Sequence, residues 1–120
     1  MAIPPTVTLS QLAAARSSRL GQRASIGVVA HTQAGYDFLS SELTATRVQN
    51  HFARWGVVQV ERYVLPRVWA FHFVLNGPWE GPANPMLRFD TEGRLLAMAL
   101  LELELPRPDS ITQMTEQLGG

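Results

Sequence analysis

The chain has 120 residues, 46% of them hydrophobic and 17% charged, and its ten arginines balance ten acidic residues. This length fits one domain with one core, and the lack of a basic surplus argues against nucleic acid as a partner, because phosphates attract cations. No cysteine is present, which excludes disulfides, thiolate catalysis and cysteine-ligated metal sites. The apolar runs are too short to cross a membrane and no secretory signal is visible, so we expect a cytoplasmic protein.

Both ends of the chain contain prolines, which disfavour regular structure. We therefore expect a short leader over residues 1–5, a folded domain over residues 6–105 and a flexible polar tail over residues 106–120. Near the start of the domain, residues 16–22 are polar, contain a glycine and are predicted to form a loop. The apolar, β-branched segment 25–30 predicts a strand in the centre of a sheet.

Residues 33–55 predict two consecutive helices, because apolar residues recur every three or four positions. The residues expected to be buried are Tyr36, Leu39 and Leu43 in the first helix and Val48, Phe52 and Trp55 in the second. Thr44 is a typical N-cap for the second helix, and Gly56 stands where a glycine commonly ends a helix.

Two runs of β-branched and aromatic residues, 57–65 and 68–76, flank Pro66 and Arg67 and predict an antiparallel hairpin. Large and small side chains alternate in the second run, so they should point to opposite faces of the sheet. We expect a core face with Trp69, Phe71, Phe73 and Leu75 and an outer face with Ala70, His72, Val74 and Asn76.

The rest of the domain predicts a short strand at 86–89, a turn at 90–93 and, over 94–104, a helix with a strand-like end. A strand, a helix, two antiparallel strands and a helix in this order describe an α+β ferredoxin-like sandwich, an antiparallel sheet with helices on one face. The other face would be open, and an open face with apolar side chains commonly meets a ligand or another subunit.

Short motifs along the chain, taken together, resemble one known family. They are Ala-Arg-Ser at 15–17, Gly21, Ile-Gly-Val-Val-Ala at 26–30, Glu-Leu-Thr-Ala at 42–45, Arg-Val at 47–48, Val-Glu-Arg-Tyr at 60–63, Leu-Pro at 65–66, Phe-Val-Leu at 73–75, Leu-Arg at 87–88, Asp90 and Gly93. In order and spacing they resemble the ferredoxin-fold domain at the C-terminus of acyclic terpene utilisation protein A (AtuA), which also occurs as a separate small protein. The resemblance implies a ferredoxin-like fold and work beside a larger partner in acyl or terpenoid catabolism.

The polar motifs depart from the pattern of that family. Its members typically read Ala-Arg-Ser-Gly-Asp-Lys-Gly-Asp and then Asn-Ile-Gly, where this chain has Ala-Arg-Ser-Ser-Arg-Leu-Gly-Gln at 15–22 and Ser-Ile-Gly at 25–27. A glycine-rich loop of the family is replaced by Gly-Pro-Trp-Glu-Gly-Pro at 77–82, and His72 stands where asparagine is usual. The ancestral activity is therefore either lost or directed to a different ligand.

The polar segment 16–22 is a candidate anion site. Arg16, Ser17 and Arg19 could hold a carboxylate or phosphate, because guanidinium groups bind such anions bidentately. The same residues could equally belong to an ordinary solvated loop.

His72 is the candidate for proton transfer, because histidine titrates near neutral pH. Glu80 would be its carboxylate partner, and Asn76 and Trp79 would line the same ligand site. The alternative is an inert histidine on the sheet face. No spacing typical of metal ligands occurs, so we expect neither a metal nor a cofactor.

Two functions remain open at this point. The first is a small accessory or partner-binding subunit that acts through its open sheet face, with a second copy of the chain (a homodimer) or a large AtuA-type protein as partner. The alternative is a small-ligand-binding protein or an enzyme (an isomerase, hydratase or cyclase) that acts on a hydrophobic acyl or terpenoid molecule, with His72 as acid–base group.

Overall fold

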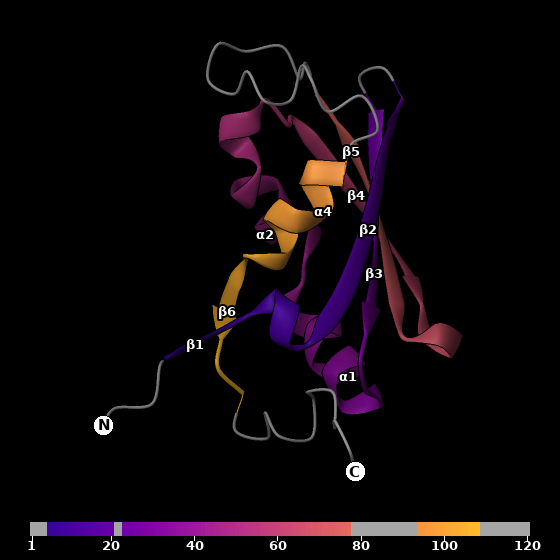
Figure 1. The fold of residues 1–120 in the computed structure, drawn as a ribbon, viewed down its shortest axis with the longest axis vertical. Helices are drawn as coiled ribbons and strands as arrows, with labels where there is room; N and C mark the ends of the chain where they lie inside the picture. The colour runs from indigo at the N-terminus through magenta and orange to yellow at the C-terminus, as the bar shows by residue number, and fades with distance from the viewer. Residues whose placement is uncertain (1–4, 21–22, 78–93, 109–120) are drawn as a thin grey trace.

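The computed structural model describes residues 5–20, 23–77 and 94–108. Its main sheet has four antiparallel strands in the order β2-β3-β5-β4, which are β2 (Ala13–Leu20), β3 (Arg23–Ala30), β5 (Ala70–Asn76) and β4 (Gln59–Leu65). A small second sheet pairs β1 (Thr6–Thr8) with β6 (Glu104–Pro106). The helices lie on one side of the main sheet (Figure 1): α1 (Gln33–Glu42), α2 (Ala45–His51) and α4 (Arg94–Leu101). This is the α+β sandwich that the sequence predicts.

The two helices between β3 and β4 both begin at a threonine, of which Thr44 is the predicted cap, and α2 ends at His51, earlier than the predicted end at residue 55. Thr32 starts α1 and accepts a hydrogen bond from the Gly35 N–H at 2.9 Å. Thr44 starts α2 in the same way and accepts from the Arg47 N–H at 3.1 Å. A 3₁₀ turn (Ala53–Trp55) follows, and Gly56 ends it with φ 89°, a conformation that favours glycine.

The core lies between these helices and one face of the main sheet. Successive side chains of a strand alternate between faces, and the register aligns the inward residues of β3 and β5. The inward residues of the two strands are all buried: Ala24, Ile26 and Val28 in β3, and Phe71, Phe73 and Leu75 in β5. Tyr36 of α1 stacks on Phe71 with ring centroids 4.9 Å apart. The predicted hairpin and its alternation are thus confirmed over β5.

Residues 16–20 form a strand and not the predicted loop. They belong to β2, which pairs with β3 from Ala13 opposite Ala30 to Leu20 opposite Arg23. The prediction was wrong because alanine, serine and arginine are weak strand formers, whereas pairing with a central strand decides the structure here. The rest of that segment, residues 21–22, and the strand and turn predicted at 86–93 lie outside the described residues.

Trp69 is predicted to lie in the core and is instead 36% exposed. A 3₁₀ turn (Pro66–Val68) connects β4 and β5, and Trp69 follows it with φ 55°, in the left-handed region. This conformation takes the tryptophan out of the strand, so its side chain escapes the alternation that buries Phe71.

Two long-range hydrogen bonds hold α4 against the rest of the fold. The Ala97 N–H donates to Ser17 Oγ of β2 at 2.9 Å, and His51 Nε2 at the end of α2 donates to the Ala99 carbonyl at 2.8 Å. The chain then leaves α4 and enters β6, so segment 94–104 is a helix with a strand-like end, as predicted. Ser17 of β2 thus accepts from a backbone N–H in the first turn of α4 and ties this helix to the sheet.

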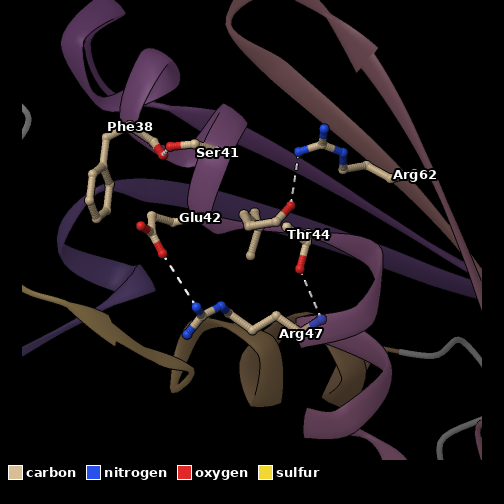
Figure 2. A network of polar contacts seen from close by, with 7 residues as sticks. Phe38, Ser41, Glu42, Thr44, Arg47 and Arg62 are labelled. Atoms are coloured by element: carbon tan, nitrogen blue, oxygen red, sulfur yellow. Dashed lines mark hydrogen bonds and ion pairs between the residues drawn. The ribbon is translucent and has the colours of Figure 1, made fainter.

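The end of α1 is held by a side chain of the sheet. Nη1 of Arg62 in β4 donates to the carbonyls of Ser40 at 2.9 Å and Leu43 at 3.1 Å. Figure 2 shows the guanidinium pointing toward this helix end, beside the hydrogen-bonded pair of Arg47 and Glu42. A cation suits this position because the last carbonyls of a helix are unpaired and partly negative.

We expect Arg62→Ala to lower the free energy of unfolding by about 2 kcal/mol, because the end of α1 loses a charged donor. Urea denaturation followed by circular dichroism measures this. Arg47→Ala is the matched control: it breaks only the partly exposed 3.3 Å ion pair with Glu42, which should contribute less than about 1 kcal/mol. Equal losses in both variants would contradict the role of Arg62.

We expect Ser17→Ala to cost about 1 kcal/mol of stability and to speed amide hydrogen exchange in α4, because Ala97 loses its acceptor. Ser18→Ala is the control, since Ser18 has the outward parity of β2 and its Oγ hydrogen-bonds Ser25 Oγ at 3.1 Å. Unchanged exchange in α4 of the Ser17 variant would show that the contact does not hold the helix.

Candidate functional site

None of the described helices covers the face of the main sheet opposite the core (Figure 1). The register places its residues in rows that run across the four strands. We call Ala14, Val29, Ala70 and Leu65 the apolar row, Arg16, Gly27, His72 and Tyr63 the central row, and Ser18, Ser25, Val74 and Glu61 the third row. Arg23, Asn76 and Gln59 form the outermost row. The open face therefore changes from apolar to polar along the strands.

His72 lies beside a hollow on the polar part of this face. The hollow has a volume of about 290 Å³, and its polar lining consists of Ser18, Arg23, Ser25 and His72. The two serine hydroxyls contact each other at 3.1 Å. This set offers one cation and several hydrogen-bond donors in a space large enough to take a carboxylate or phosphate group, and such anions bind well to these groups.

The predicted anion site of Arg16, Ser17 and Arg19 is divided between the two faces of the sheet. Arg16 points outward in the central row, whereas Ser17 and Arg19 have the inward parity of β2 and lie on the helix side. Gly27 separates Arg16 from His72 in the central row, and two strand spacings put them about 10 Å apart. Arg16 and His72 line different hollows.

A second concavity runs beside the β2 edge, between that strand and α4. It has a volume of about 540 Å³ and is lined by Ala15, Arg16, Ser17, Ser18, Ala97, Met98 and Leu101. Its lining is mostly apolar, with Arg16 as the charged group. Ser17 lies in this groove, where its hydroxyl accepts from Ala97.

Tyr63 and Glu61 form a polar pair on the exposed edge strand. Tyr63 Oη donates to Glu61 Oε2 at 2.8 Å, and the Tyr63 and His72 rings lie 6.5 Å apart. The hydrogen bond to Glu61, together with the negative charge of that carboxylate, raises the pKa of Tyr63 above its usual value. The tyrosine hydroxyl therefore remains protonated over the physiological range.

The remaining predicted site residues are placed as follows. Asn76 lies in the outermost row between Arg23 and Gln59, next to the row that contains Ser25. Glu80 and Trp79 lie outside the described residues. Ser18, Arg23 and Ser25 were not predicted as neighbours of His72. Because alternate residues of a strand share one face, these three residues could have been placed on the face of His72 if β2 had been recognised as a strand.

The described ranges contain no cluster of three or more histidine or acidic side chains placed to hold a metal ion. In the same ranges, no helix combines the length and apolar character needed to span a bilayer.

The sequence model of the AtuA ferredoxin-like domain matches residues 7–106, which include every helix and all but the first residue of the strands described above. Comparisons with curated proteins and with solved structures gave no match. The family and the observed layers agree on a ferredoxin-like α+β fold. The chain belongs to the AtuA ferredoxin-like domain family.

Proposed function

We propose that this chain is a small partner-binding subunit that works beside a large AtuA-type protein in acyl or terpenoid metabolism and uses its open sheet face for contact. Family membership supports the kind of partner. The observation that carries the proposal is the apolar surface around the hairpin end of the face. Val29, Leu65 and Val68 are each 46–60% exposed there, and contiguous apolar surface of this kind commonly marks an interaction site.

The shape of the hairpin supports the same function. The turn between β4 and β5 projects away from the helices at the lower right of Figure 1. Tyr63, Val64 and Trp69 near this end add exposed hydrophobic side chains. Large aromatic side chains with a polar group are common anchors of protein interfaces. A partner that covers this end would remove these side chains from water.

We expect Leu65→Asp to weaken binding to the large AtuA-type protein at least tenfold, because a charge replaces a side chain whose burial contributes about 2 kcal/mol. Isothermal titration calorimetry with both purified proteins measures the affinity. Val58→Asp is the matched control, since Val58 is 62% exposed but precedes β4 outside the rows of the open face. The proposal fails if the unmodified chain does not bind at about 100 µM or if both variants bind alike.

Binding of a small acidic molecule is a second candidate function, supported by the hollow beside His72. Arg23 would pair with a carboxylate, and the hydroxyls of Ser18 and Ser25 would donate to it. The hydrophobic part of an acyl ligand would extend over Val74 toward the apolar side of the face. His72 would then stand beside the bound carboxylate, where a proton donor or acceptor can act.

We expect octanoate to shift the amide NMR signals of Ser25 and His72, and Arg23→Gln to weaken that binding at least tenfold through loss of the charged donor. Arg54→Gln is the control, because Arg54 is exposed in the turn after α2, away from the open face. Shifts that persist in the Arg23 variant, or shifts at α4 in place of β3, would exclude the hollow as the binding site.

A further inference from the structure

We infer that a second copy of this chain covers the open face, with a two-fold axis that runs along the strands between β3 and β5. This inference rests on the part of the proposed function that makes the open face an interaction surface, and it assigns that surface to a second copy, which would compete there with the large AtuA-type protein. Such an axis places β4 over β2 of the second copy and β5 over β3 of the second copy, at the same level along the strands. Two twisted sheets pack face to face in this way with their strands about 30° apart.

The apolar rows of the two copies then face each other. Leu65 lies over Ala14 of the second copy, and Ala70 lies over Val29 of the second copy, in both directions because the interface is symmetric. An axis across the strands would instead put the apolar row over the outermost row of Arg23, Asn76 and Gln59. That arrangement would bury polar groups against hydrocarbon, which is unfavourable.

At the centre of the interface, His72 faces Gly27 of the second copy. Gly27 has no side chain, and a Cβ built there would meet only the Arg16 carbonyl oxygen, at 3.9 Å. The position is therefore a gap between Arg16 and His72 in the central row. A half-buried imidazole ring from the second copy would fill this gap, and the two-fold axis forms the contact twice.

At the two sides of the interface, the charges are complementary. The hydrogen-bonded pair of Tyr63 and Glu61 lies over Arg16 and Ser18 of the second copy. Glu61 and Arg16 are both exposed in the single chain and make no ion pair with a described residue there. The Glu61 carboxylate and the Tyr63 ring both attract the Arg16 guanidinium of the second copy. Each side of the interface therefore gains an ion pair between Glu61 and Arg16.

The size of the face limits the interface that two copies can form. Four strands about 4.8 Å apart and four rows about 7 Å apart give roughly 500 Å² per copy, or about 1,000 Å² in total. This area is at the lower limit for a specific interface, so we expect a dimer that forms with a micromolar dissociation constant and dissociates on dilution.

Charge reversal tests this arrangement. In sedimentation velocity over about 1 µM to about 1 mM chain, we expect Arg16→Glu and Glu61→Arg each to raise the dissociation constant at least tenfold, because each creates two like-charge pairs. The double variant should return to within about threefold of the unmodified chain. Arg54→Glu is the matched control and should dimerise normally. Circular dichroism melts confirm that every variant is folded.

The outcomes separate this inference from the proposed function. An unmodified chain that stays monomeric at about 1 mM overturns the homodimer. A dimer that neither single variant weakens, or that the double variant fails to restore, overturns the predicted axis. All these measurements use the chain alone, so they do not depend on whether a large AtuA-type protein binds. Failure to bind that protein would conversely leave the dimer intact.

Discussion

The antiparallel pairing of β3 with β5 determines how the rest of the molecule is arranged. The register sets Ile26 opposite Phe73 and Val28 opposite Phe71, so the large side chains of both central strands share one face. All four are completely buried, and α1, α2 and α4 can cover only the face that carries them. A shift of one residue would turn this apolar surface toward water, so the register is strongly specified. The same alternation puts the remaining side chains of both strands, His72 and Gly27 among them, on the open face.

Because β2 pairs with β3 as a strand, neighbouring residues of its polar segment point to opposite faces of the sheet and have different roles. Arg16 faces outward and is available to a partner, whereas Ser17 faces inward and accepts a hydrogen bond from α4. The hydrogen bond to α4 thus gives a structural role to Ser17, the serine that this chain shares with the family pattern. The departures of this segment from the family pattern lie at other positions, and the contact that positions α4 is present despite them.

Partner binding and small-ligand binding would use overlapping parts of one surface. A protein partner on the open face would cover the hollow beside His72, because Ser25 and Val74 belong to both. A small ligand in that hollow and a second copy over the face would therefore exclude each other. Such competition is a simple way to couple ligand binding to assembly, since a ligand shifts the equilibrium toward the state that binds it.

Local patterns in the sequence determined the two helices between β3 and β4, the cap at Thr44, the end of the following turn at Gly56, the hairpin and the inward direction of Phe71, Phe73 and Leu75. These features depend on side-chain periodicity and cap chemistry within a few residues. Only the tertiary structure decided that Ser18, Arg23 and Ser25 surround His72, because strand pairing brings together residues up to about fifty positions apart. Trp69 was misplaced for the same kind of reason: its left-handed backbone follows from how the turn joins two paired strands, which no alternation of side chains records.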